Sequence, residues 1–331
     1  MLPYIVRRIG YMLVVLFATA TVSFVLIELP PGDYLTSYII TLRETGADVS
    51  KAEIASLEKQ YGLDLPLYRR YLKWLGDIIR GDFGRSFEWN RPVGELLAER
   101  LPLTIIISSF SMVFIYGVGV PIGIYSALHQ YSVRDHVFTF LGVIGLATPN
   151  FLLALILMFG FYSWFGWSPG GLFSPEYEAA AWSIAKFLDM LKHLPVPIIV
   201  IGTAGTAGVI RIMRGVLLDE LRKQYVITAR AKGVVERKLL FKYPVRVAIN
   251  PIVSTIGWVL PAVVSGSTIT SIVLGLPTTG ALLFGALISQ DTYLAGSAVM
   301  FLSFLTILGT FISDILLLWL DPRIRYEKQA K

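Results

Sequence analysis

Several long stretches of apolar residues constrain this chain more than any other feature. A bilayer-spanning helix needs about 20 apolar residues, and the sequence offers six such segments, near residues 9–29, 103–128, 137–165, 196–213, 252–274 and 297–320. Only 16% of the 331 residues are charged, whereas about a quarter are charged in a soluble domain. We therefore predict an all-α membrane protein with six transmembrane helices, and we exclude a soluble enzyme and a disordered chain.

The first apolar run is expected to remain as an anchor. Arg7 and Arg8 precede a run that extends from Ile9 to Leu29 and is interrupted only by Glu28. A cleavable signal peptide has an apolar core of only about 7–15 residues. Residues 1–29 are therefore interpreted as an N-terminal transmembrane helix.

The positions of Lys and Arg predict the orientation of the chain. Connection 211–250 carries ten of them against three acids, whereas the connection between Leu276 and Gly296 carries none. Because short cytoplasmic loops are enriched in Lys and Arg, both termini and connection 211–250 are predicted to be cytoplasmic. The expected location is the cell (inner, cytoplasmic) membrane. Contact of these loops with the lipid bilayer accounts for the net charge of +6, so nucleic acid is not an expected partner.

Segment 30–101 is predicted to be an extracytoplasmic helical insertion, followed by a five-helix core over residues 102–331. The insertion is longer than the loops to which the charge rule applies.

Two helices are expected in this insertion. Ser50 and Glu53 form a capping box before residues 52–61, and Pro66 precedes apolar side chains at helical spacing up to Ile78. Packing on the outer leaflet, under a docked partner, or of the two helices on each other all fit this pattern.

Motifs for catalysis and metal binding are absent from the sequence. The patterns HExxH, GxSxG and GxxxxGK[ST] do not occur, there is no cysteine, and His129, His136 and His193 are scattered. We therefore expect no catalytic residue, no metal site and no cofactor bound by this chain. Glu28 and Asp314 are the acids well inside predicted spans, which is thin support for an ion-driven pump.

Glycine and proline inside the predicted spans indicate close helix contacts and bends. Residues 148–150 (Thr-Pro-Asn) interrupt the third span, and Gly202, Gly205 and Gly208 recur in the fourth. Proline bends a helix because it lacks an amide donor, and small residues let helices approach closely. A moving pore and ordinary packing both fit these features.

The segment from Tyr225 to Leu240, in the basic connection, is predicted to form one short amphipathic helix at about 226–240. Thr228 could cap its start, and Pro244 lies beyond its end. One side would carry Ile227, Ala231, Val235 and Leu239, and the other Ala229, Arg230, Gly233, Glu236 and Arg237.

Gly233 is the unusual residue of this predicted helix. A glycine in mid-helix costs about 1 kcal/mol against alanine, so Gly233 suggests close approach by another molecule. Docking on a partner protein fits this choice, and a basic helix resting on anionic lipid fits the neighbouring Lys and Arg residues equally well.

Motifs along nearly the whole chain resemble one transporter family. The stretch from Ala229 to Gly233 follows Asp219-Glu220 and Tyr225 and precedes Glu236-Arg237 and Asn250-Pro251. Further motifs are Tyr4 to Arg8, Pro31 to Asp33, Tyr61 to Leu63, Pro66 to Tyr68, Tyr71 to Trp74, Gly81 to Gly84 with Ser86, Arg91 to Val93, Leu101-Pro102 and Leu320 to Tyr326. In this order they resemble the permease subunits of binding-protein-dependent ABC importers, in particular the dipeptide and oligopeptide branch.

The resemblance implies a type I ABC importer permease fold and a set of partners. These are a second homologous permease, two ATP-binding subunits that hold ATP and Mg²⁺, and an extracytoplasmic solute-binding protein. The resemblance also implies a coupling helix that sits in a cleft of an ATPase subunit. Its residues would be Ala229, Arg230, Ala231, Lys232, Gly233, Glu236 and Arg237.

The expected function is ATP-driven import by alternating access, and the expected solute is a peptide. Thr270 to Gly280 departs from the family pattern, so short oligosaccharides such as cello-oligosaccharides are the alternative solute. The residues that contact the solute are not identifiable from the sequence. An ion-driven secondary transporter, an intramembrane enzyme and a membrane scaffold are the rival classes.

Overall fold

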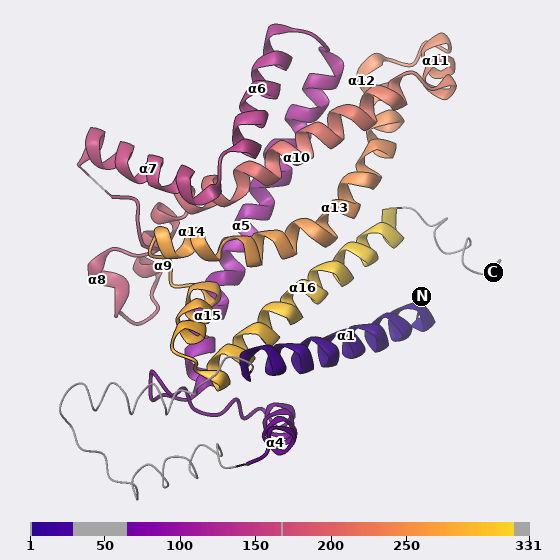
Figure 1. Ribbon diagram of the computed structural model, residues 1–331. Helices are drawn as coiled ribbons and strands as arrows, with labels where there is room; N and C mark the ends of the chain where they lie inside the picture. The colour runs from indigo at the N-terminus through magenta and orange to yellow at the C-terminus, as the bar shows by residue number, and fades with distance from the viewer. Residues whose placement is uncertain (1, 29–64, 167, 321–331) are drawn as a thin grey trace, which may run out of the picture. The chain divides into compact units, whose positions relative to one another are not determined.

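The computed structural model describes residues 2–28, 65–166 and 168–320, and within them every regular element is a helix (Figure 1). This confirms the all-α fold. Candidate membrane spans among these residues are α1 (Leu2–Glu28), α5 (Val93–Leu128), α10 (Pro195–Leu221), α13 (Pro244–Gly266) and α16 (Thr292–Leu320). The predicted helix at 52–61, the side chain of Glu28 and the motif residues from Asp321 to Tyr326 lie outside the described residues.

The sixth candidate span consists of two helices, α6 (Val133–Ala147) and α7 (Asn150–Phe165). The direction of the chain bends by 106° between them. Thr148, between them, adopts an extended conformation with ψ 120°. The residue before a proline is driven out of the helical region by the proline ring. The apolar run 137–165 is therefore broken at Pro149, as residues 148–150 predicted, and is not one straight helix.

Helix boundaries differ from the predicted ones where charged residues continue a helix. α5 begins at Val93 rather than near residue 103, and its first turns carry Glu95, Glu99 and Arg100. A span predicted from hydropathy ends at such charged residues. The helix itself can continue through them where it lies outside the hydrocarbon core. The predicted fifth span at 252–274 instead comprises most of α13 and, after Ser267, α14 (Thr268–Val273).

The chain forms two compact units. Unit 1 comprises residues 1–104 and 277–307 and contains α1, α4 (Leu67–Ile79), the start of α5, α15 (Thr279–Ile288) and the start of α16. Unit 2 comprises residues 105–276 and 308–331. Its remaining helices are α8 (Pro175–Glu178), α9 (Ile184–His193), α11 (Gln224–Ala231) and α12 (Glu236–Lys242), in addition to α6, α7, α10, α13 and α14. The division at residues 29 and 101 stays a prediction.

In unit 1, helix α4 packs against α1. Trp74 is 3% exposed and lies beside Ala20 and Phe24, with 5.4 Å between the ring centroids of Phe24 and Trp74. Tyr71 donates to or accepts from Thr21 Oγ1 at 2.6 Å. The helical pattern predicted after Pro66 is thus confirmed, and α1 covers its apolar face.

In unit 2, glycines bring α5 and α10 into close contact. A Cβ atom on Gly202 would lie 2.6 Å from Phe114 Cδ1, and one on Gly205 would lie 2.8 Å from Ile115 Cδ1. Real Cβ atoms essentially never show separations this short, so any larger residue would force the facing side chain of α5 to shift, whereas glycine lets the two helices approach closely. The predicted close contact is confirmed for these two glycines, whereas Gly208 faces open space.

Substitution of Gly123, which belongs to the same contact, tests this packing. A Cβ there would lie 2.7 Å from Met213 Cβ and 3.1 Å from the carbonyl oxygen of Ile210. Because a backbone atom cannot rotate away, we expect Gly123→Ala to lower stability by about 1–3 kcal/mol. Gly117→Ala, on the same helix with no atom within 4 Å, is the matched control. Thermal unfolding in detergent measures both, and equal midpoints would contradict the packing.

Candidate functional site

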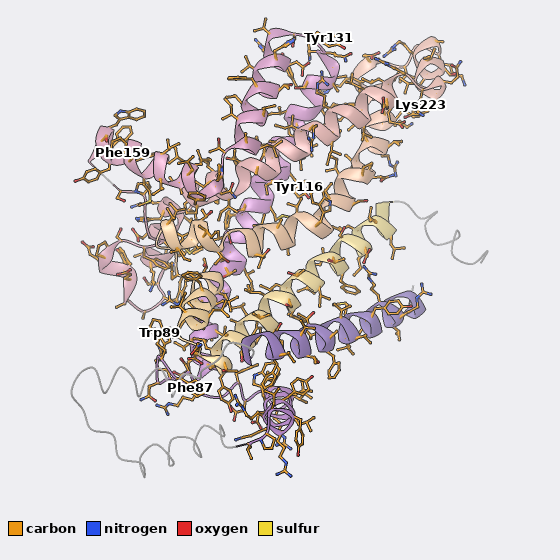
Figure 2. All side chains as sticks on the ribbon, viewed as in Figure 1. Phe87, Trp89, Tyr116, Tyr131, Phe159 and Lys223 are labelled. Atoms are coloured by element: carbon orange, nitrogen blue, oxygen red, sulfur yellow. The ribbon has the colours of Figure 1, made fainter. Side chains whose placement is uncertain are left out.

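The α11–α12 segment, residues 224–242, lies at one end of unit 2, where α10 ends and α13 begins (Figure 1). α11 starts after Lys223, which Figure 2 labels. The segment consists of two helices separated by residues 232–235, so the prediction of one continuous helix at about 226–240 is wrong.

Gly233 is the reason for the break. Its φ is +75°, its N–H donates to the Arg230 carbonyl at 3.0 Å, and the N–H of Val234 donates to the Ala229 carbonyl at 3.3 Å. These two bonds and a left-handed glycine make up a Schellman motif, which satisfies the last carbonyls of a helix. Val234 also packs against the apolar cluster that contains Ala229, and an apolar contact of this kind often accompanies the motif. Gly233 therefore ends α11 rather than lying in mid-helix.

A small apolar core holds the two helices together. Val226 and Leu239 are fully buried and Ala229 is 8% exposed, with Val234 and Tyr243 packed on them. The two short helices therefore behave as one body, because neither can move without opening this core.

The predicted faces of the segment are only partly confirmed. Leu239 is buried, but Ile227 and Val235, predicted to share its side, are 48% and 72% exposed. Ala229, from the opposite predicted side, is buried instead. The break at Gly233 rotates α12 relative to a continuous helix, which moves Val235 to the surface. Thr228 does not cap the start of α11, since its hydroxyl donates to the Gln224 carbonyl within the helix.

An ion pair spans the break. Arg230 donates from Nε to Glu236 Oε2 at 3.1 Å and from Nη2 to Oε1 at 2.6 Å. The hydrogen bond with Glu236 raises the pKa of Arg230. An exposed pair of this kind adds little stability, but its bidentate geometry fixes the orientation of two charges on one surface. The other exposed residues among those expected to contact an ATPase are Ala231, Lys232, Gly233 and Arg237.

Tyr225 connects the segment to α10. Its hydroxyl donates to Glu220 Oε2 at 2.5 Å. Burial, and then the neighbouring Glu220 carboxylate, raise the pKa of the Tyr225 phenol. The start of α11 is thereby fastened to the last turns of α10.

A second polar contact, which was not predicted from the sequence, joins α10 to α6. Asp135 is 2% exposed and accepts from Arg214 Nε and Nη2, both at 2.9 Å, and from the Tyr131 N–H at 2.9 Å. Ser132 accepts from the Asp135 N–H and caps α6. The S-x-x-D pattern at 132–135 was the available signal. Its pairing with Arg214 was not visible, because 79 positions separate the two residues.

A groove in unit 2 with mostly apolar walls and a few neutral polar groups is the second feature that the sequence did not identify. Trp258, 60% exposed, borders two cavities of about 550 and 220 Å³. The larger is also lined by Asn250, Ser254 and Thr255, and the smaller by Asn150. Neutral polar groups within a span are expected to face protein or a water-filled cavity rather than lipid.

The polar groups of the larger cavity all come from α13, and α5 holds one of them in place. Thr255 is 5% exposed and shares a 2.8 Å hydrogen bond with the hydroxyl of Tyr116, labelled in Figure 2. Asn250 and Ser254 lie one helical turn apart on α13. Hydropathy does not detect such a set, because single neutral residues barely change the mean of an apolar span.

Comparison with known proteins agrees with this architecture. Residues 119–326 match the family model described as binding-protein-dependent transport system inner membrane component, and residues 1–108 match the model of its N-terminal region. The oligopeptide transport system permease protein AppB of Bacillus subtilis is 34% identical over 98% of this chain and 100% of its own length.

Two further relatives are similar over their full length. The oligopeptide transport system permease protein OppB of Haemophilus influenzae is 32% identical over 98% of this chain. The di/tripeptide transport system permease protein DppB of Pseudomonas aeruginosa is 30% identical over 99% of this chain.

The Schellman motif predicts how Gly233 tolerates substitution. Gly233→Val should raise the free energy of the turn by about 1–2 kcal/mol, because the left-handed region is costly for L-residues. Gly233→Asn should cost less, since asparagine enters that region more easily. Hydrogen exchange of the backbone amides over residues 224–242 measures both. The same exchange rates in the two variants would count against the motif.

Proposed function

This chain belongs to the binding-protein-dependent transport system inner membrane components and is a multi-pass permease subunit of an ABC importer, and we propose that it imports peptides. The observation that carries the proposal is the end-to-end similarity to permeases named for oligopeptides and for di- and tripeptides. The oligosaccharide alternative and the ion-driven alternative are not favoured by these relatives.

The proposed assembly contains this permease, a second homologous permease, two ATPase subunits and an extracytoplasmic solute-binding protein. The family itself implies a binding protein and ATPase partners. ATP and Mg²⁺ are bound by the ATPases, since this chain has no phosphate-binding loop. The ten basic residues of connection 211–250 support cytoplasmic termini and a cytoplasmic α11–α12 segment.

In this proposal the α11–α12 segment docks in a cleft of one ATPase subunit. The segment offers apolar contacts through the exposed side chains of Ile227 and Val235, and charged contacts through the Arg230–Glu236 pair. The open space around Gly233 leaves room for a close approach there. A rigid segment is suited to the task, because a loose one would absorb the displacement of the ATPase.

Movement of the docked segment would reach the membrane helices through two polar contacts. Tyr225–Glu220 fastens the segment to α10, and Arg214–Asp135 fastens α10 to α6. Bound ATP would favour the outward-facing state, and hydrolysis would reset it. The result is alternating access driven from the cytoplasmic side.

The groove beside Trp258 supports a peptide as solute. Asn250, Ser254 and Thr255 supply amide and hydroxyl groups and no net charge. Such groups can exchange hydrogen bonds with a peptide backbone whatever its side chains, and the Trp258 ring can pack against the side chains. A path built in this way would accept peptides of many sequences.

Substitution of Val235 tests the docking. Val235→Glu should abolish copurification of the ATPase subunits and lower uptake by about tenfold or more, because docking would bury an unpaired carboxylate. Val235→Ile keeps the apolar surface and serves as the control. Uptake into proteoliposomes and the subunit composition of the purified assembly are the measurements. Unchanged copurification with Val235→Glu would exclude this face.

Solute uptake tests the peptide assignment. In proteoliposomes that hold the assembly and its binding protein, we expect ATP-dependent uptake of a labelled pentapeptide and none of labelled cellotetraose. Trp258→Ala should lower peptide uptake by roughly tenfold through loss of aromatic contact. Assembly with the ATPases should be retained, since Trp258 lies outside the α11–α12 segment. Uptake of the sugar alone would overturn the assignment.

A further inference from the structure

Residues 84–92 of unit 1 form a closed turn between α4 and α5. The Ser86 N–H donates to the Arg91 carbonyl at 2.9 Å, and the Val93 N–H donates to the Gly84 carbonyl at 3.0 Å. Arg85 reaches across the turn to Asn90, with Nε 2.8 Å from Oδ1 and Nη2 2.6 Å from the carbonyl oxygen. The ends of the turn are thus held together by backbone and side-chain bonds.

The carboxylate of Asp291 holds this turn in place by hydrogen bonds. Its Oδ2 accepts from the Ser86 hydroxyl at 2.5 Å and from the N–H groups of Phe87 and Glu88 at 2.8 and 3.3 Å. Its Oδ1 accepts from the Leu294 N–H at 3.1 Å and so caps the start of α16. Asp291 is fully buried, and loss of so many bonds to a buried carboxylate is costly. The backbone of the turn is therefore rigid.

The Asp291 contact also predicts the side of the membrane on which the turn lies. Asp291 belongs to the connection between Leu276 and Gly296, which has no Lys or Arg and is predicted to be extracytoplasmic. A residue that hydrogen-bonds to Asp291 lies on the same side. The turn is thus predicted to be extracytoplasmic, on an argument that does not depend on the length of segment 30–101.

The turn presents a tryptophan to solvent. Phe87 is 5% exposed and packs edge-on against Tyr293, whereas Trp89, two residues later, is 46% exposed (Figure 2). Glu88 and Asn90 beside it are exposed as well. Tryptophan is usually well buried in a free protein and is enriched among the residues that dominate binding at interfaces.

We propose that this turn is the surface by which the permease binds its solute-binding protein, with Trp89 as the anchoring side chain. The proposal rests on the importer function given above, which requires a soluble partner on this side. A turn already fixed by Asp291 loses little conformational freedom on binding, so more of the contact energy appears as affinity. Glu88, Asn90 and Arg85 supply the polar rim that such interfaces have.

A protein partner explains the turn better than a lipid headgroup layer does. Tryptophan is also common at the membrane interface, but anchoring in lipid requires only the ring and no fixed backbone. Here a buried carboxylate and several hydrogen bonds fix the backbone.

The decisive experiment measures ATPase activity of the complete assembly in nanodiscs as the loaded binding protein is titrated. Trp89→Ala should raise the half-stimulating concentration by about tenfold or more while the rate at saturation is retained. Ser86→Ala removes the bond to Asp291 and the bond that the Trp89 N–H donates to the Ser86 hydroxyl at 3.1 Å, but it keeps the indole ring, and should therefore raise it by a smaller factor. Trp164→Ala, at an exposed tryptophan of α7, should leave it unchanged.

The outcomes separate the proposal from the importer function. An unchanged half-stimulating concentration with Trp89→Ala overturns the docking surface and leaves the importer function standing. Absence of any stimulation or peptide uptake in the unmutated assembly would instead overturn the importer function.

Single cysteines provide a second readout, because the chain has none of its own. A bimane label on Trp89→Cys should change emission when the binding protein is added. A label on Tyr131→Cys should not, because Tyr131 is 75% exposed in the loop between α5 and α6, which the alternation of six spans predicts to be cytoplasmic. An impermeant maleimide applied from outside should react with the first variant only. Quenching of the Trp89→Cys label by brominated lipid would place the turn in the bilayer and overturn the proposal.

Discussion

The absence of water from the hydrocarbon core is the constraint on which this structure depends. Backbone N–H and C=O groups there can form hydrogen bonds only within the protein, so the described spans are helices. The polar contacts described above are therefore found mainly at the ends of helices. Gly233 ends α11, Asp291 begins α16, and Asp135 lies in the first turn of α6. The candidate functional segments are therefore those where the chain must satisfy the last groups of a helix.

The glycine contacts between α5 and α10 and the polar contacts at the end of α10 have complementary effects. Gly202 and Gly205 remove the side chains that would keep the helices apart, so displacement of one helix presses directly on the other. Tyr225–Glu220 joins the α11–α12 segment to α10. The α11–α12 segment has its own small core and is joined at one end to the tightly packed helix α10. Such a segment is suited to transmit a displacement to the membrane helices.

The sequence predicted the features that depend on local pattern and missed those that depend on distant pairing. Apolar runs gave the spans, and proline gave the bend at Pro149. The helix through Gly233 was wrong because its apolar residues continue at helical spacing across the break, and the left-handed φ of one glycine is not encoded in that spacing. Asp135–Arg214 and Ser86–Asp291, 79 and 205 positions apart, follow only from the tertiary fold.

The turn at 84–92 separates what the family resemblance explains from what it does not. Gly84, Ser86 and the Arg91 to Val93 stretch are among the residues that carry the resemblance, and they close the turn or bind Asp291. Trp89 is not among them, nor are its neighbours at the tip. The resemblance therefore accounts for a rigid support, while the exposed tip is free to differ. A permease that must match one binding protein gains from this arrangement, since specificity can change at the tip without loosening the Asp291 contact.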